Sequence, residues 1–320
     1  MTFEPVLNVL LANLAVMALG WLVQQRLHNA GIADLLCAAS IGVSAAYYGA
    51  VAAASMFSQV LVCALGGVWA FRLVMTLLRR MLAEREDARY RYMRQAADGR
   101  TVTFVPLFAY RAVSATLFSM SLYAAAANPS GAPRAWTLLG AAVYAVGLLG
   151  QMCADVQLAA FRAQPRNFGR SCRRGLWRYC RHPNYFFEAV HWSAYPILAI
   201  GTPWPIWPLA LCAPVLTVLE WIVAIPTAEA QALRTRGDDY RAYRSATQAL
   251  LPWFPRGWPH DEAEFAATAA QPSPRNTPRR STPVAAVRTP LPAYLATNPS
   301  RTITDEIMPP AAGVGAGERR

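Results

Sequence analysis

The chain has 320 residues, of which 55% are hydrophobic and only 15% are charged, a balance typical of a membrane protein. All 30 basic residues are Arg, against 18 acidic residues, so the net charge is +12 and Lys-based chemistry such as a Schiff base or a P-loop is excluded. The six Cys and four His show no paired spacing, so we expect neither a metal site nor a disulfide framework. We also expect no nucleic-acid binding, because Arg in short loops between apolar spans reports membrane orientation instead.

Seven apolar runs are long enough to cross a bilayer core, which needs roughly 20 residues of helix. They lie near residues 5–24, 33–53, 56–78, 103–126, 135–159, 185–201 and 205–225. The second and third are separated by only a residue or two around Ser55, and Pro196 interrupts the sixth. The first run lacks the basic region and cleavage site of a removable signal peptide, so we expect it to stay in the membrane. The prediction is an all-α, polytopic transmembrane bundle of about seven spans.

Two connections between these spans are strongly basic. Residues 79–100 hold seven Arg and four acids, and residues 162–181 hold seven Arg and no acid. The connections on the opposite side carry one Arg in total. The excess of Arg in cytoplasmic loops predicts that both basic connections and the C-terminus are cytosolic and that the N-terminus is outside.

The sequence changes character after the last span. Residues 226–255 are polar but helix-forming, and we interpret them as a cytosolic helix lying against the membrane face. From about residue 256 the chain is rich in Pro, with nine between 272 and 310, which predicts a disordered tail. Four Ser-Pro or Thr-Pro pairs in it would suit proline-directed phosphorylation, although a passive extension explains the composition better. The expected domains are therefore a transmembrane domain, 1–255, and a tail, 256–320.

Residues 175–188, which read Gly-Leu-Trp-Arg-Tyr-Cys-Arg-His-Pro-Asn-Tyr-Phe-Phe-Glu, form the densest polar stretch. Planar guanidinium groups suit bidentate phosphate contacts, and no acid neutralises them within the basic connection. Pro183 predicts the first turn of a new helix, whose N-terminal amides favour an anion. The Arg residues could merely set orientation and the aromatic residues lie at the interface. Because orientation does not require His182, Asn184 and Glu188 together, the stretch favours a binding site for a pyrophosphate and a ribose phosphate.

Ionisable residues inside or at the edge of spans are the second signal, because a charge at membrane depth must find a partner or a polar cavity. They are Asp34, Arg72, Arg111, Asp155, Glu188 and Glu220. Asp155 and Glu188 flank the basic connection, so we expect them to bind hydroxyl and amide groups of its ligand. Arg72 and Arg111 are expected either to snorkel or to pair with the two remaining acids. His191, one turn beyond Glu188, is expected to be a satisfied helix histidine rather than a catalytic one.

These residues resemble the steroid 5-alpha-reductase-like integral membrane reductases, in particular the branch described only by an uncharacterised domain. That group is related to the sterol reductases and, more distantly, to isoprenylcysteine and phospholipid methyltransferases. The resemblance is carried by residues 175–188, by Asp155 with Gln157, by the run from Trp69 to Arg72 and by the segment from Glu229 to Trp253. It covers about residues 7–255.

The resemblance implies NADPH-dependent reduction of a carbon-carbon double bond in a membrane lipid, such as a steroid or sterol-like enone. It implies contacts of the dinucleotide phosphates and nicotinamide with residues 178–185, of the adenosine end with Asp155, and a pocket closed by the C-terminal segment. The residues expected at the NADPH site are Asp155, Arg162, Arg170, Arg178, Arg181, His182, Asn184, Tyr185, Glu188, Glu229, Tyr240 and Tyr243. It also implies a multi-pass protein of the endoplasmic reticulum with a lipophilic substrate.

Several positions depart from the family pattern. Phe187 stands where the family usually has Gly, Gln151 where it has an acid, and Arg111 where it commonly has Gln. These changes affect the substrate end more than the cofactor end, and the proton donor is not identified. Its candidates are Tyr48, Tyr90, Tyr110 and Tyr123.

Two other functions remain open from the sequence. An S-adenosylmethionine-dependent lipid or prenylcysteine methyltransferase would share the Arg-His-Pro motif, but those enzymes often carry a Glu pair where this chain has the single Glu229. A non-catalytic sterol-binding membrane protein is the second alternative, which only Phe187 supports.

Overall fold

The computed structural model describes residues 3–52, 54–83, 86, 88–130 and 134–256, and the predicted tail from 257 onward lies outside this part. The predicted all-α class is confirmed, because the described residues form helices and no strand. The long helices are α1 (Glu4–Leu27), α2 (Ile32–Val51), α3 (Met56–Ala83), α5 (Val105–Ala126), α6 (Ala135–Arg162), α8 (Pro183–Leu198) and α9 (Cys212–Ala246). The short ones are α4 (Ala88–Ala96), α7 (Leu176–Tyr179) and the 3-10 turns η1 (Thr101–Phe104), η2 (Pro165–Asn167) and η3 (Trp207–Leu211).

Each predicted span overlaps one of the seven long helices, although α9 begins later and ends much later than its predicted span. Among the described residues, six helices are long and apolar enough to cross a membrane, which makes this a multi-pass membrane protein. The seventh, α8, has only 16 residues. Its start is set by Pro183, since proline lacks the N–H that a first helical turn leaves unbonded anyway. Pro196 lies inside α8 close to its end.

The segment after residue 226 departs from the prediction of a separate helix. α9 continues through Pro226 as one helix of 35 residues. The Thr227 hydroxyl donates to the carbonyl oxygens of Val223 and Ala224 at 3.1 and 2.9 Å, so polar groups beside the proline are satisfied locally. The regular helix is broken only at Gly237, with φ 51° and ψ −121°. The last span and the polar segment are therefore a single element.

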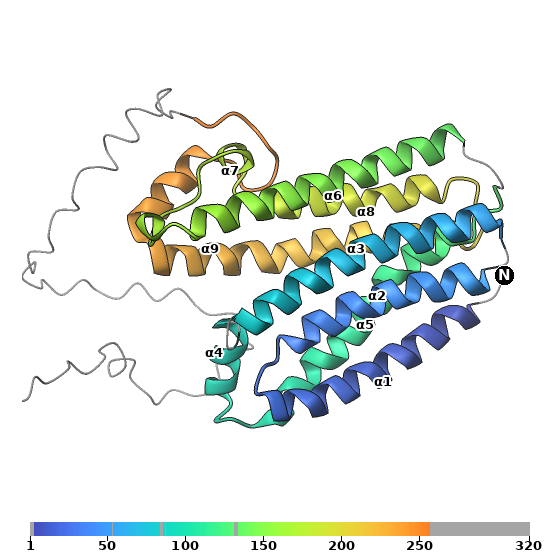
Figure 1. Ribbon diagram of the computed structural model, residues 1–320, viewed down its shortest axis with the longest axis horizontal. Helices are drawn as coiled ribbons and strands as arrows, with labels where there is room; N and C mark the ends of the chain where they lie inside the picture. Colours follow the sequence, from blue (N-terminus) through green and yellow to red (C-terminus); the bar gives the residue numbers. More distant parts are fainter. Residues whose placement is uncertain (1–2, 53, 84–85, 87, 131–133, 257–320) are drawn as a thin grey trace, which may run out of the picture. The chain divides into compact units, whose positions relative to one another are not determined.

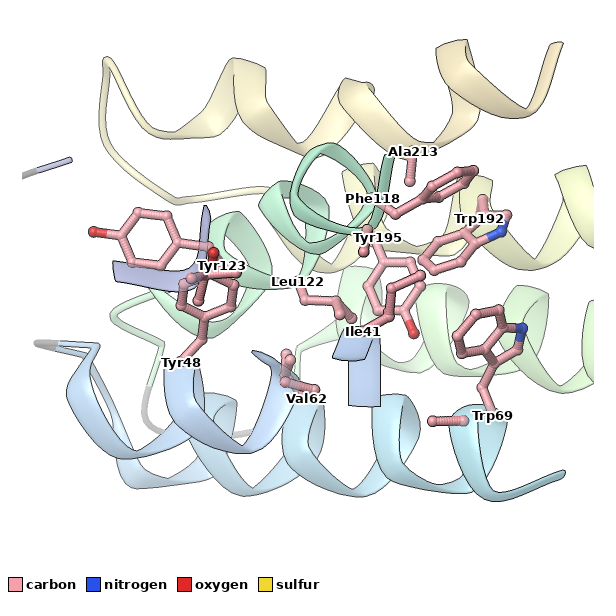
Figure 2. Packing of buried hydrophobic residues seen from close by; sticks show 14 of the residues in the cluster. Ile41, Tyr48, Val62, Trp69, Phe118, Leu122, Tyr123, Trp192, Tyr195 and Ala213 are labelled. Carbon is pink, nitrogen blue, oxygen red and sulfur yellow. The ribbon is translucent and has the colours of Figure 1, made fainter. Parts of the chain in front are cut away.

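The helices run along a common axis and pack closely where small residues meet (Figure 1). Gly42 of α2 faces Ala70 of α3, and Gly66 of α3 faces Ala45 of α2. Large aromatic side chains fill the centre, as Figure 2 shows for Trp69, Phe118 and others. Many large apolar side chains point outward on the same helices, such as Leu7, Leu11 and Leu19 of α1. A soluble protein would not expose such continuous apolar surface, whereas a bilayer covers it.

Both basic connections lie at one end of the bundle. α4, in the first connection, and α7, in the second, stand at the same end in Figure 1. We call it the basic end. Because successive long helices run in opposite directions, Arg26 and the C-terminal part of α9 lie at this end as well. The positive-inside rule predicts that it faces the cytosol.

Candidate functional site

A layer of charged side chains crosses the bundle between α3 and α6. Arg72 of α3 donates from Nη1 to Oε1 of Gln151 at 2.6 Å and forms an ion pair through Nη2 with the carboxylate of Asp155. The Arg72 side chain is largely buried, and a buried guanidinium needs such partners because removing it from water is costly. Arg72 therefore pairs with Asp155, and not with Asp34 or Glu220 as the sequence suggested.

Two further acids reach the same layer from α8 and α9. Glu220 precedes Glu229 by nine residues on α9, which places it about 13 Å along the helix from Glu229 and further from the basic end. Glu220 accepts hydrogen bonds from the hydroxyls of Tyr110 at 3.0 Å and Ser114 at 3.3 Å. Glu188 interacts electrostatically with Arg72, Asp155 and Glu220. The layer thus holds three carboxylates around one guanidinium.

A separate ion pair stabilises the other half of the basic end. Arg111 of α5 contacts Asp34 of α2 at 2.5 Å, and Tyr90 of α4 donates to the other oxygen of Asp34 at 2.8 Å. Of the two alternatives for Arg111, snorkelling or pairing with Asp34 or Glu220, the structure shows the ion pair with Asp34. α4 is fixed further by Arg94, which bonds to Glu86 at 2.9 Å. This pairing holds α2, α4 and α5 together and leaves Tyr90 engaged away from the Arg72 layer.

The second basic connection is anchored on α6 beside Asp155. The Trp177 indole N–H donates to the carbonyl of Ala154 at 2.9 Å, and the backbone N–H of Leu176 donates to Gln157 Oε1 at 2.9 Å. Ala154 and Gln157 lie one and two residues from Asp155 in sequence, so α7 is attached to α6 at the height of Asp155. Within the described part of the chain, neither the Arg174 nor the Arg178 guanidinium has a carboxylate partner, in contrast to Arg173, which pairs with Asp239 at 3.0 Å. Of the other predicted residues, Arg162 ends α6 and Arg170 lies between η2 and α7.

Arg181 is bound on all sides by protein groups. Its Nε and Nη2 donate to Oε1 of Glu229 at 2.9 and 2.7 Å, and both side chains are only 9% exposed. Its Nη1 donates to the carbonyls of Arg244, at 3.0 Å, and of Thr247. Those carbonyls belong to the last turn of α9 and its cap, where a helix leaves acceptors without intrahelical partners. Arg181 therefore closes the end of α9.

The segment that follows α9 is held by backbone hydrogen bonds to the residues around Arg181. The backbone N–H groups of Arg181 and His182 donate to the carbonyls of Gln248 and Ala249 at 2.9 and 3.1 Å. The N–H of Trp253 donates to the carbonyl of Tyr179 at 3.0 Å. We call residues 247–253 the strap. Sequence reasoning missed it because it depends on backbone pairing in a segment without apolar periodicity.

The remaining predicted residues surround Arg181. His182 Nε2 lies 3.4 Å from Oε1 of Glu229, and burial lowers the pKa of this imidazole below its usual 6.5 despite the carboxylate. The Tyr185 ring stacks on His182 with centroids 5.4 Å apart. Tyr243 donates to the carbonyl of Trp177 at 2.5 Å, and its ring meets Tyr240 edge-on. Seven of the twelve predicted residues thus gather around the strap, α7, the start of α8 and the end of α9: Arg178, Arg181, His182, Tyr185, Glu229, Tyr240 and Tyr243.

Asn184 and Phe187, both in the first half of α8, have different surroundings. Asn184 has a buried Oδ1 without a hydrogen-bond partner among the described residues. Phe187 packs its ring onto α6 at Gly150, where any side chain would collide with it. The large Phe187 ring therefore fits against α6 because the facing residue, Gly150, has no side chain.

An aromatic cluster around His191 lies on the side of the Arg72 layer that faces away from the basic end. It was not anticipated from the sequence. His191 is fully buried between Trp69, Tyr144, Trp192 and Tyr195, with its ring stacked on Trp69 at 5.7 Å. Neither imidazole nitrogen has a hydrogen-bond partner among the described residues, so the expectation of a satisfied histidine was wrong. The spacing of residues 188, 191, 192 and 195 places them on one helix face, a signal that the sequence did contain.

The four candidate proton donors are now distinguished by position. Tyr48 lies 3.3 Å from the Ser119 hydroxyl, and its ring packs against Tyr123. Both are near the end of α2 that is remote from the basic end. Tyr90 is bonded to Asp34, and only Tyr110 contacts an acid of the Arg72 layer.

Comparison with known proteins gives a family and no characterised relative. No curated protein and no solved structure matches the chain. Among the described residues there is also no group of three or more His, Cys, Asp or Glu side chains that could hold a metal ion. Residues 20–247, more than half of the chain and all of the site described above except strap residues 248–253, match a family described as protein of unknown function (DUF1295). The chain is a multi-pass membrane protein that belongs to the DUF1295 family.

Proposed function

We propose that this protein reduces a carbon-carbon double bond in a membrane lipid with NADPH. The observation that carries the proposal is the anchoring of α7 on α6 at the height of Asp155, in a basic connection where Arg174 and Arg178 have no carboxylate partner among the described residues. A soluble dinucleotide has the complementary form, with phosphates at one end and a redox-active ring at the other. The resemblance to the steroid 5-alpha-reductase-like reductases supports the same function.

The charges divide into a phosphate part and a hydroxyl part. Arg174 and Arg178 would hold phosphate oxygens, because a guanidinium donates two parallel hydrogen bonds to such a group. Asp155 and Glu188 would accept from ribose hydroxyls or the carboxamide, since ionised carboxylates only accept. The buried Oδ1 of Asn184 is a further acceptor without a partner among the described residues. Arg181, in contrast, would act as a positioning residue that holds the strap.

A bundle of this kind suits the chemistry. NADPH, when bound, supplies a hydride, and a dry surrounding protects that transfer from water. The lipid reaches the bundle from the bilayer, whereas the cofactor arrives at the basic end, so the two reactants need not share an entrance. Charge that develops on a conjugated oxygen during hydride transfer requires a hydrogen-bond donor nearby.

The test is a comparison of NADPH, NADH and S-adenosylmethionine binding to detergent-solubilised protein. We expect NADPH to bind most tightly, because its additional phosphate gains an arginine contact. Arg174→Ala and Arg178→Ala should each weaken NADPH binding about 10-fold or more, as expected for a lost charged hydrogen bond. Arg100→Ala is the matched control, because this exposed arginine precedes η1 on the α1 side and should leave binding unchanged.

Two results would overturn the proposal. Saturable binding of S-adenosylmethionine without NADPH binding would identify a methyltransferase. Binding of neither, or NADPH affinity that is unchanged in both arginine variants, would exclude the cofactor site at α7.

A further inference from the structure

The strap ends in large apolar side chains that the protein leaves exposed. Leu251, Trp253 and Phe254 are 68%, 67% and 75% exposed. We call residues 251–256, which are the last residues of the strap and the three that follow it, the strap end. Single apolar residues on a surface are normal, but a contiguous group of them marks a surface that contacts another molecule or a membrane.

The C-terminal part of α9, directly before the strap, exposes polar and charged side chains instead. Asp238 and Arg241 form an ion pair on its surface, and Arg244 and Ser245 are exposed as well. Such a composition is expected of a segment that faces water. The change from charged to apolar exposed side chains therefore indicates that the strap end lies in a different medium from the end of α9.

Hydrogen bonds fix the height of the strap end in the bundle. The N–H of Trp253 donates to the carbonyl of Tyr179, the last residue of α7, at 3.0 Å. Trp177, also in α7, donates to the carbonyl of Ala154 in α6 at 2.9 Å. Ala154 lies in the apolar run 135–159, roughly 8 Å before its end. The strap end is therefore attached near the end of one span.

The start of α8 gives the same height. The N–H of His182 donates to the carbonyl of Ala249 in the strap at 3.1 Å, directly before Pro183 begins α8. Figure 1 shows the strap, in orange, beside α7 at the basic end. Two spans thus begin or end at the level of the strap, which is the level at which lipid headgroups surround a bundle of this kind.

The chemistry of the strap end matches the headgroup region of an anionic leaflet. Aromatic side chains such as tryptophan and tyrosine are enriched at this level of a membrane. The ring of Phe254 packs edge-on against Tyr179, with centroids 5.9 Å apart, so strap and α7 share one partly exposed aromatic surface. Arg256 is exposed two residues further on, and residues 247–256 contain no acid. The basic connection 162–181, to which α7 belongs, has seven Arg and no acid either. Positive charge without neighbouring acids is attracted to anionic lipids.

We propose that the strap end inserts into the headgroup region of an anionic leaflet, with Leu251, Trp253 and Phe254 among the lipids and Arg256 at a lipid phosphate. This interaction goes beyond the proposed reductase function and needs neither cofactor nor substrate. The leaflet, rather than another protein, is the partner because the strap end lies at the level of the headgroups. Since Arg181 bonds to the strap carbonyls, lipid contact would also hold in place the segment that closes the end of α9.

Spin labels at the strap end test this contact. Trp253→Cys and, in a second protein, Leu251→Cys are labelled in the full-length chain. The three native cysteines that are not buried are first replaced by Ser: Cys63, Cys153 and Cys212. In vesicles of phosphatidylcholine with phosphatidylglycerol, electron paramagnetic resonance measures collisions of each label with oxygen, which concentrates in lipid, and with a water-soluble nickel chelate. We expect oxygen collisions to exceed chelate collisions at both positions.

Ser245→Cys is the matched control. This exposed residue lies in the last turn of α9 among charged side chains, and its label should collide mainly with the chelate. The role of charge is tested with Arg256→Gln and, separately, with vesicles of phosphatidylcholine alone. Each change should lower the ratio of lipid-exposed to water-exposed label at position 253 by about 5-fold, the contribution expected of one arginine near an anionic surface.

Three results would overturn the proposal. Labels at 251 and 253 that collide mainly with the chelate, as at 245, would place the strap end in water. Protection of both labels from oxygen and chelate alike would show that protein covers this surface. Equal ratios in anionic and neutral vesicles, unchanged by Arg256→Gln, would exclude recognition of anionic lipid. All these measurements are made without NADPH, so failure of the proposed reductase function would leave their outcome unaffected.

Discussion

Substitution of Arg181 by Ala tests whether this arginine is structural or contacts the cofactor. The change removes two contacts to Glu229 and two to the final carbonyls of α9. Glu229, 9% exposed, would retain only His182 at 3.4 Å and the half-exposed Arg244 at 3.3 Å. Breaking one side of a buried ion pair typically costs about 3–5 kcal/mol. We therefore expect a loss of about 3 kcal/mol and release of the strap.

The assay is thermal unfolding in detergent combined with limited trypsin digestion. For a domain of this size, 1 kcal/mol corresponds to a shift of roughly 2–4 °C, so the melting temperature should fall by about 6–12 °C. Cleavage after Arg244 should accelerate, because the strap no longer protects it. Arg241→Ala is the matched control: its ion pair with Asp238 is fully on the surface, and we expect a change within about 0.5 kcal/mol. An unchanged melting temperature in Arg181→Ala, with weakened NADPH binding, would refute the structural role.

Three further predictions follow from the packing and the charges. Gly147→Ala should destabilise the protein by about 1–3 kcal/mol, because the methyl group collides with the backbone of α8, whereas Gly67→Ala, with nothing within 4 Å, should be neutral or slightly stabilising in the same unfolding assay. Asp155→Asn should lower the melting temperature, because it leaves the charge of Arg72 unpaired. The double variant Asp155→Asn with Arg72→Met should recover part of this loss, because it also removes the unpaired charge. A double variant that is less stable than Asp155→Asn would contradict this. Burial depresses the pKa of folded His182 below 6.5, so the unfolded chain takes up the proton first and stability should fall as the pH drops below about 6.5; a pH-independent difference from His182→Gln would argue against this coupling.

The sequence predicted the helices better than their side-chain partners. Span positions follow from apolar length, which is why α1, α2, α3, α5, α6 and α8 lie close to the expected ranges, whereas α9 runs well beyond its expected end at 225. Partners depend on which helices pack together. Pairing of Arg111 with Asp34 was one of the alternatives that the sequence left open, but Arg72 pairs with Asp155, 83 residues away on α6, which the sequence did not indicate. The unpartnered nitrogens of His191 were not predictable, since burial without a partner runs against the usual pattern.

The contacts of Arg181 with Glu229 and the end of α9 can form only late in biosynthesis. Its acceptors, Glu229 and the carbonyls near residue 247, are made 48 to 66 residues after it, and a chain is synthesised from the N-terminus. While α8 and α9 are still being inserted, the connection of seven arginines has no such acceptors and presents its full charge. That is the period in which positive charge decides orientation. One stretch of chain can thus guide insertion first and be recruited into the finished site only when its last helix arrives.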